Sequence, residues 1–494
     1  MSNQNKQIIN NESANDFEKR LRWKKNKRGV NMENSLSTSK EMNEVQIKKA
    51  VPAVLALMIF ALVIDNSFKI ISADLASTFN LSATAVSWQV TLAGLVIGIG
   101  AIVYASLADS ISIRSLLVLG IILICIGSLL GFIFQKSFFM IIVSRIIQAA
   151  GLGSAETLYV IFVAKYFKDS EQKKYLGFST SSFAISQVIG TLTGGYISTY
   201  LHWTVLFLIP LLTLLILPFI LKYIPKEKAT GKGIDFVGFI LVSAVSASLM
   251  LFVSGFEWIY LVALIIALVL FITYISKNKK AFISIEFFKN RNFISVLLVA
   301  FVIYSVQLAF IFMFPFLIEY IYNYRLDQVS LLLVPSYVLA AIVGAMSGNV
   351  AKRFGSKQCI QMAIIGIIIS LIFGSLFIQT SVYVFVFVMI LFSSSFAFMY
   401  APMIDTLIKT IPKENSGTAI GFYNFCLNIA TSIGITYVAV LMEAKPLGKN
   451  ITGLFNNEIC IQYSNVLIVL AIISAVAFVL YWSLIGRREK SENK

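Results

Sequence analysis

Long apolar stretches separated by short polar turns run along most of the chain. We place fourteen of them, and each is close to the roughly 20 residues that a helix needs to cross the hydrocarbon core of a bilayer. A water-soluble fold cannot bury so many wholly apolar helices, so the pattern predicts an all-α, multi-pass protein of the cell membrane. The expected spans are 51–72, 87–108, 115–134, 138–163, 176–200, 203–224, 236–254, 258–276, 293–320, 330–350, 358–379, 382–404, 418–442 and 464–485.

The two ends of the chain have a different pattern. Residues 1–49 are polar, charged and rich in Asn, Ser and Lys, which is typical of a disordered tail. Residues 487–494 form a second short polar tail. Because the first 41 residues contain no apolar run, Met42 is a candidate for the true start of translation, with Met32 as the alternative.

The basic residues are distributed unevenly between the two sets of loops. Most of the 40 Lys and Arg lie in the tails and in the loops that follow the even-numbered spans. The opposite loops contain only Lys136, Arg325, Lys445 and Lys449. By the positive-inside rule this asymmetry predicts that both termini are cytoplasmic. The net charge of +16 therefore reflects topology, and we expect no nucleic-acid partner.

Composition excludes several classes of function. The chain is 58% hydrophobic and 13% charged, against about 25% charged residues in an average soluble domain. It has four scattered cysteines and one histidine, His202, so no metal site or disulfide framework is indicated. We find no nucleophile motif and no paired metal-binding acids, so we expect neither an enzyme nor a cofactor.

A weak internal repeat divides the chain into two comparable parts. Residues 105–114 follow the second span, residues 348–357 follow the tenth, and both are polar turns between helices. Two related halves with a substrate site between them are common in secondary transporters. We therefore expect two six-helix bundles and an inserted helix pair. The predicted division is 50–225 for the N-terminal bundle, 226–280 for the inserted pair and 281–486 for the C-terminal bundle.

Two charged residues lie in the first span. Asp65 and Lys69 are four residues apart, a spacing that places them on one face of a helix. Charges at membrane depth are costly and usually face a partner or a water-filled cavity. We interpret Asp65 as a carboxylate that takes up a proton or a cationic substrate, with Lys69 as its modulator. The alternative is a local ion pair near the outer surface.

The fourth span has its own polar face. Arg145, Gln148 and Glu156 follow one another at spacings that keep them on one side of a helix. We interpret them as further proton-coupling or substrate-binding residues, and the alternative is a packing role satisfied by backbone carbonyls. Glu319 and Asp405 lie at span ends, where contact with solvent explains them.

Glycines in the second and fifth spans recur at the four-residue spacing that lets helices pack closely. They are Gly94 and Gly98 in the second span, and Gly190 and Gly194 with the adjacent Gly195 in the fifth. We expect the fifth span to pack tightly against a neighbour and to flex at the glycines.

Four short motifs resemble signatures of the major facilitator superfamily. Residues Ala105 to Arg114 are similar to G-x-L-A-D-R-x-G-R-[KR], matching its acid at Asp109 and its final base at Arg114, and the later copy retains Arg353. The run Arg145-Ile-Ile-Gln148-Ala-Ala-Gly151 is similar to R-x-x-Q-G. The run Gly190-Thr-Leu-Thr-Gly194-Gly195 is similar to the antiporter signature G-P-x-x-G-G, with Thr191 in place of proline.

The order of these motifs resembles the fourteen-helix drug/proton antiporters, and within them the Gram-positive tetracycline-efflux antiporters. The stretches 73–80, 104–120 and 190–210 carry the closer likeness. The resemblance implies a monomeric exporter of a small amphiphilic drug, tetracycline as its divalent-metal chelate, in exchange for protons across the lipid bilayer. It also implies that Arg145 takes part in proton coupling, whereas Asp109, Arg114 and Arg353 latch conformations.

Two alternatives keep the fold and change the transport. One is export of other amphiphiles such as fatty acids or dyes, because a fold does not determine function. The other is uptake by proton symport, which the glycine signature of the fifth span disfavours.

Overall fold

Helices make up the body of the computed structural model. It describes residues 47–108, 110–225, 235–278, 281, 285–412, 416–448 and 455–486. Within these ranges thirteen helices are long and apolar enough to cross a membrane. The predicted tails, including Met42, fall mostly or wholly outside the described residues, as does Asp109.

The helices follow one another with short connections. The N-terminal group contains a first helix (Ile47–Ile70), α2 (Ser72–Phe79), α3 (Ala83–Ala108), α4 (Ile113–Ile133), α5 (Phe138–Tyr166), α6 (Asp169–Tyr200), the 3₁₀ segments η1 (Trp203–Phe207) and η2 (Ile209–Leu215), and α7 (Leu217–Tyr223). Next come α8 (Phe236–Gly255) and α9 (Trp258–Lys277). The C-terminal group contains α10 (Ile285–Lys289), α11 (Arg291–Tyr322), α12 (Leu326–Phe354), α13 (Ser356–Leu376), α14 (Val382–Ile408), α15 (Ser416–Glu443), η4 (Lys445–Gly448), α16 (Glu458–Tyr481) and η5 (Trp482–Gly486).

Side-chain caps mark where several of these helices begin. Ser112 accepts a hydrogen bond from the Ser115 backbone N–H at the start of α4, and Asn457 accepts bonds from two backbone N–H groups at the start of α16. Such caps satisfy backbone donors that have no partner within the helix. The turns therefore fix the helix starts that the apolar pattern alone leaves uncertain.

The fifth expected span, 176–200, lies within α6, which is the exception among the long helices. It has 32 residues, but it is rich in Ser, Thr and Gly and is not among the helices apolar enough to be counted as a span. A polar helix can lie at membrane depth when its polar face is buried against other helices.

The sixth expected span, 203–224, is not one regular α-helix. It consists of η1, η2 and α7, and both η2 and α7 have proline in their first turn. Proline has no backbone N–H to donate and its ring clashes with the preceding turn, so the chain restarts at Pro210 and Pro218. The apolar pattern gave the span but not this break.

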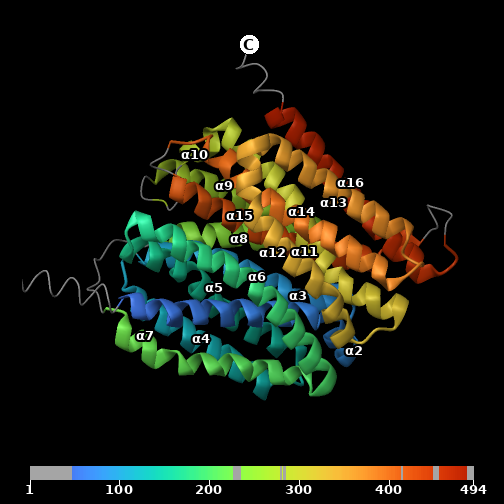
Figure 1. The fold of residues 1–494 in the computed structure, drawn as a ribbon, viewed down its shortest axis with the longest axis horizontal. Helices are drawn as coiled ribbons and strands as arrows, with labels where there is room; N and C mark the ends of the chain where they lie inside the picture. Colours follow the sequence, from blue (N-terminus) through green and yellow to red (C-terminus); the bar gives the residue numbers. More distant parts are fainter. Residues whose placement is uncertain are drawn as a thin grey trace, which may run out of the picture.

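Two groups of helices face each other in the molecule. Figure 1 shows the N-terminal group, from blue to green, running close to the horizontal, and the C-terminal group, from yellow to red, running diagonally. The groups meet where α3 packs against α15 and α6 packs against α12. We call this interface the seam. The inserted α8 packs against both α3 and α15, beside one side of the seam.

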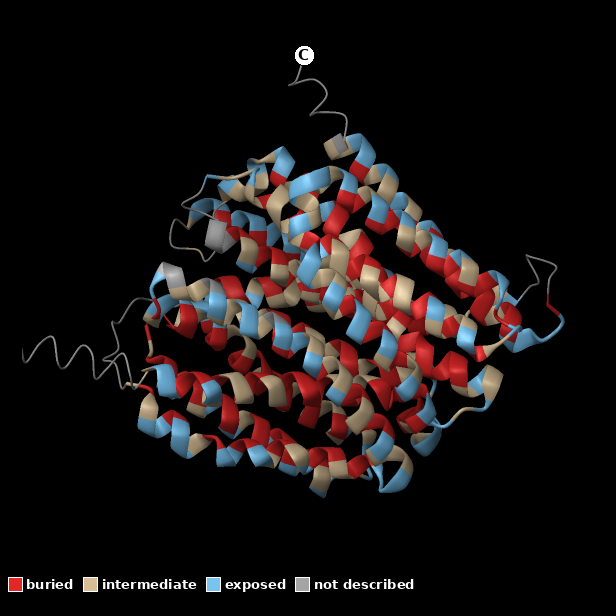
Figure 2. Cartoon of the chain, in the orientation of Figure 1, coloured by how far each residue is buried: buried red, intermediate tan, exposed pale blue. Residues whose placement is uncertain are grey.

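Burial is arranged as expected for a molecule surrounded by lipid. Figure 2 shows buried positions along the inner faces of the helices and exposed positions on the outside. The exposed side chains of α9 are large and apolar, among them Trp258 at 78% and Ile259 at 69% exposure. Apolar exteriors are what a bilayer requires, because its core offers no water to solvate polar groups.

Candidate functional site

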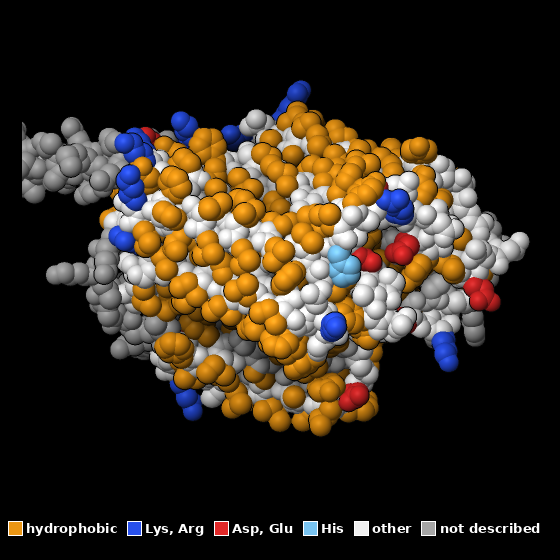
Figure 3. All heavy atoms as spheres, turned by 90° about the horizontal axis from the view of Figure 1, so that it is seen from below, with side chains coloured by type: hydrophobic (Ala, Val, Ile, Leu, Met, Phe, Trp, Pro, Cys, Tyr) orange, Lys and Arg blue, Asp and Glu red, His pale blue; other side chains and the backbone are white. Residues whose placement is uncertain are grey.

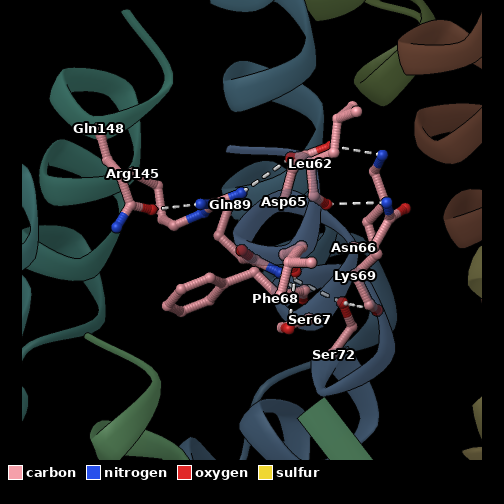
Figure 4. Close-up of polar contacts among 11 residues, drawn as sticks. Leu62, Asp65, Asn66, Ser67, Phe68, Lys69, Ser72, Gln89, Arg145 and Gln148 are labelled. Carbon is pink, nitrogen blue, oxygen red and sulfur yellow. Dashed lines mark hydrogen bonds and ion pairs between the residues drawn. The ribbon is translucent and has the colours of Figure 1, made fainter. Parts of the chain in front are cut away.

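A buried ionic cluster joins the first helix to α5. The Asp65 carboxylate lies 2.5 Å from the Lys69 ammonium and 3.2 Å from the Arg145 guanidinium. Asp65 is 7% exposed and Arg145 is completely buried. Figure 4 shows the carboxylate between the two cations, one on its own helix and one on the neighbouring helix. Within this trio, one negative charge therefore serves two positive charges.

Gln148 and Phe68 hold the guanidinium in place. Arg145 donates from Nη1 to the Gln148 side-chain oxygen, and Gln148 donates to the Ser128 hydroxyl at 2.9 Å. On the other side, the guanidinium carbon lies 4.3 Å from the centre of the Phe68 ring, a favourable cation–π distance. The Arg145 Nε–H has no acceptor among the described residues. The network is fixed in position but not fully satisfied.

Glu156 completes the charge of this region. It is half-buried on α5 and lies within electrostatic range of both Asp65 and Lys69. Its carboxylate makes no hydrogen bond or ion pair with any of the described residues. With Glu156 ionised the formal charge of the four groups is zero, so a change in protonation at one carboxylate unbalances the whole group.

Close glycine packing on α6 positions the first helix. An added Cβ at Gly190 would lie 2.7 Å from the Val63 carbonyl oxygen, and at Gly194 2.7 Å from the Ser67 carbonyl oxygen. The Ser67 hydroxyl donates back to the Gly190 carbonyl at 2.8 Å. The helix carrying Asp65 and Lys69 therefore rests on a strip of α6 that has no side chains. Because α6 continues through Thr191 without a break, the proline kink of the antiporter signature is absent here.

The seam is closed at one end of the molecule. We call this the far end, opposite the terminal end where the first helix begins and α16 ends. There, the Glu443 carboxylate at the end of α15 accepts hydrogen bonds from the Thr84 backbone N–H and hydroxyl, at 2.9 and 2.8 Å. The Tyr200 hydroxyl donates to Asp327 at 2.8 Å. A Cβ at Gly195 would lie 1.7 Å from the Ser330 hydroxyl, so α6 and α12 nearly touch.

The same helices separate toward the terminal end. On α15, Asn428 presses against Gly98 of α3, with only 2.8 Å between Cβ positions, whereas Gly421, two turns away, has nothing within 4 Å of a Cβ. Gly177 of α6 and Gly348 of α12 are likewise open, although Gly195 near the other end of α6 is tightly packed. The seam is therefore closed at the far end and open at the terminal end.

The signature turns lie at the terminal end, away from the ionic cluster. Arg114 is half-buried at the start of α4, and Arg353 is exposed at the end of α12 with its guanidinium 5.7 Å from the Phe354 ring. In the C-terminal group, Ser356 donates to the Asp405 carboxylate at 2.5 Å, and Lys409 lies 2.7 Å from the same group. Asp405 thus joins α14 to the turn between α12 and α13. Contact with solvent is therefore not the whole role of this carboxylate.

A cavity of about 430 Å³ lies at the far end between the two groups. Its lining includes Asp74 of α2, Ser198 of α6, Glu319 of α11 and Arg325. Figure 3 shows one face of the molecule as a broad hydrophobic surface, with most of its Lys and Arg at the left and most of its acidic side chains at the right. The left end is the terminal end, so the two ends differ in charge.

The structure brings together Asp65, Lys69, Arg145 and Gln148, places Glu156 nearby, and leaves Arg114 and Arg353 apart. Sequence reasoning missed Phe68, Ser128 and Asp74. Ser and Phe are too frequent in these spans to stand out. Asp74 carried only a general signal, because an acid directly after a span indicates that the span has ended.

Comparison with known sequences identifies a protein family and several relatives. The sequence matches the family described as Major Facilitator Superfamily over residues 53–236 and 219–435. A riboflavin transporter of Clostridioides difficile (strain 630), RibZ, is 24% identical over 393 residues, covering 78% of this chain and 86% of the relative. Multidrug resistance protein 3 of Bacillus subtilis (strain 168) is 26% identical over 321 residues, covering 63% and 61%.

Solved structures agree on the fold. A POT family transporter in complex with a thioalcohol-conjugated peptide superposes with a TM-score of 0.65 at 14% identity, covering 89% of this chain and 96% of that chain. The D-xylose–proton symporter gives a TM-score of 0.60 at 14% identity, covering 87% and 96%. At this identity the likeness concerns the arrangement of helices and not the substrate.

Proposed function

This chain belongs to the major facilitator superfamily, and on that premise we propose that it is a proton-coupled antiporter that exports tetracycline-type drugs by alternating access. The observation that carries the proposal is the buried Asp65 carboxylate between Lys69 and Arg145. Burying a carboxylate at membrane depth is costly, and such residues usually mark a substrate or ion pathway or a proton relay.

In the proposed mechanism, Asp65 alternates between holding its two cations and holding a proton. Protonation removes the negative charge and leaves Arg145 and Lys69 without their counter-ion, so the first helix and α5 are no longer tied together. Glu156 then becomes the nearest ionised carboxylate. A proton and a cationic drug compete for the same negative charge, and such competition is necessarily reciprocal: each weakens the binding of the other.

We further propose that α6 crosses the membrane in addition to the thirteen apolar helices, which gives fourteen spans. Both termini then lie in the cytoplasm. An even number of crossings returns the chain to its starting side. The concentration of Lys and Arg at the terminal end supports this orientation. The form described here is then open to the cytoplasm and closed to the outside, ready to take up a drug from inside the cell.

The likeness to tetracycline-efflux antiporters suggests the substrate, and the multidrug resistance relatives support drug export in general. We propose tetracycline as its Mg²⁺ chelate, which carries positive charge toward Asp65 and Glu156. Among the described residues no group of three or more His, Cys, Asp or Glu could hold a metal on its own. The metal would therefore arrive with the drug as part of the substrate.

A second candidate is a flavin. The match to a riboflavin transporter covers 86% of that relative, which is a specific reason to test this substrate. Riboflavin shares with tetracycline a fused polycyclic ring system that bears carbonyl oxygens.

Inverted membrane vesicles with an imposed pH gradient, acid inside, test the proposal. We expect uptake of tetracycline that rises with Mg²⁺ and collapses when the gradient is abolished. Riboflavin, a cationic dye and a fatty acid serve as competing substrates in the same vesicles. If none of them accumulates in response to the gradient, proton-coupled export is wrong.

A further inference from the structure

A group of tyrosines and one asparagine lies in the C-terminal half, away from the ionic cluster. Tyr304 is on α11, Tyr400 is on α14, and Tyr423 and Asn424 are adjacent on α15. The Tyr304 ring lies 5.5 Å from the Phe396 ring, centre to centre. Three helices thus bring aromatic rings and polar groups to one place.

The hydroxyls of this group are incompletely satisfied. Tyr304 and Tyr423 are 4% and 0% exposed, and neither hydroxyl makes a hydrogen bond of good geometry with a described residue. The two hydroxyls are neighbours, and each is the only hydrogen-bond partner within reach of the other among the described residues. One such bond uses one donor and leaves the second hydroxyl proton without an acceptor. A buried donor without an acceptor is unfavourable, and folded proteins contain few of them, so this one points to a ligand.

The other two members of the group are more accessible to solvent than the buried pair. Tyr400 is 42% exposed, and its hydroxyl donates to the Asn424 side-chain oxygen at the long distance of 3.3 Å. The Asn424 amide N–H₂ group donates to no described residue. A weak bond between an exposed tyrosine and a half-buried asparagine is readily exchanged for bonds to a ligand.

The group lies where α3 and α15 begin to separate. Asn424 lies one helical turn from Asn428, which presses on Gly98, and close to Gly421, which is open. Asn424 and Tyr400 are each about 12 Å along their helices from the terminal end, and Glu156 is about 15 Å from the end of α5. Asn424, Tyr400 and Glu156 therefore lie at a similar depth on opposite halves.

We propose that Tyr304, Tyr400, Tyr423 and Asn424 form a binding site for the carbonyl-rich edge of a planar, polycyclic ligand. The inference rests on the proposed export function and adds the part of the site that the charged residues do not supply. The ligand's oxygens accept hydrogen bonds from the tyrosine hydroxyls and the Asn424 amide, and its rings stack against the aromatic side chains, which favour offset or edge-to-face contact. A ligand with a cationic part, such as the Mg²⁺ chelate of tetracycline, turns that part toward Glu156.

Equilibrium binding to the purified full-length protein in nanodiscs tests this site without a proton gradient. The probes are tetracycline with Mg²⁺, riboflavin, and ethidium, a planar cation without carbonyl oxygens. The variants are Tyr304→Phe and Tyr423→Phe, which remove one hydroxyl each and keep the rings. Tyr463→Phe, a buried tyrosine of α16 outside the group, is the matched control.

We expect each variant to weaken binding of the probe that the wild type binds, tetracycline or riboflavin, by roughly fivefold to tenfold, the effect of one lost hydrogen bond. Ethidium binding and the control variant stay within twofold of wild type. Unchanged binding of the carbonyl-rich probe in both variants would overturn the inference, as would an equal loss for ethidium. If the wild type binds no probe, the proposed function fails first, so the two failures are distinguishable.

Discussion

The Asp65 carboxylate is in direct contact with two cations, Lys69 and Arg145. This imbalance determines how substitution of any of the three residues changes stability. A buried ion pair contributes little net stability, because desolvation offsets the attraction. Removing one member is nevertheless destabilising, since a charge is left buried without a partner. The spacing of Asp65 and Lys69 predicted their contact, because residues four apart share a helix face. The contact with Arg145, 80 residues away, depends on packing that no local pattern contains.

Gln148 orients the guanidinium and can be tested separately from the charges. Gln148→Leu keeps the volume but removes the acceptor of the Arg145 Nη1 proton, so we expect proton-driven transport to fall by about fivefold to tenfold. Ser128→Ala leaves the contact between Gln148 and Arg145 in place and is expected to have a smaller effect. Initial rates in proteoliposomes at a fixed pH gradient measure both. Equal rates for wild type and Gln148→Leu would show that Arg145 needs no such support.

At the scale of elements, α6 connects the ionic cluster to the seam. It meets the first helix through Gly190 and Gly194 and meets α12 through Gly195. The glycine spacing predicted that this helix packs closely, because small residues let backbones approach. It did not give the partners, since glycine shows only that something is near. Nor did the apolar pattern give the break of the sixth span at its prolines, although proline marks such restarts.

Gly195 offers a direct test of that packing. Gly195→Ala would place a methyl group against the Ser330 hydroxyl, so we expect the closed far end to be forced apart and transport to fall at least about fivefold. The double substitution Gly195→Ala with Ser330→Gly removes the clash with the serine side chain but leaves the Leu326 carbonyl oxygen 2.6 Å from the new Cβ, so it should recover only part of the activity. Gly177→Ala, where nothing lies within 4 Å, is the control and should be near neutral. A neutral Gly195→Ala would mean that this contact is not part of the cycle.

At the scale of the whole molecule, two helix groups touch at one end and separate at the other. Such an arrangement has an obvious counterpart in which the contacts exchange ends, and rocking of two halves about a central site is how repeat-built transporters give alternating access. The sequence repeat predicted two halves. It could not predict which end is closed, because the sequence specifies both forms.

Locking the closed end tests whether it must open. We replace Thr84 and Glu443, which bond across the seam, by cysteine in a background without the native cysteines, three of which are buried. A glutamate side chain reaches further than a cysteine, so a short bis-methanethiosulfonate reagent links the two cysteines. The cross-link should abolish transport, and reduction, which removes it, should restore transport. Each single-cysteine variant treated in the same way is the control. Full transport by the cross-linked protein would contradict movement at this end.

The central claim is that Asp65 carries the proton that drives export, and drug-driven proton flux measures it most directly. Proteoliposomes containing a pH-sensitive dye are given the substrate that accumulates in the vesicle assay, and proton movement is recorded for wild type, Asp65→Asn and the control Asp235→Asn, whose side chain caps α8. We predict proton flux for wild type and Asp235→Asn, and flux reduced about tenfold or more for Asp65→Asn, which also binds a cationic drug more weakly because the same carboxylate attracts it. Undiminished proton flux in Asp65→Asn would contradict the account.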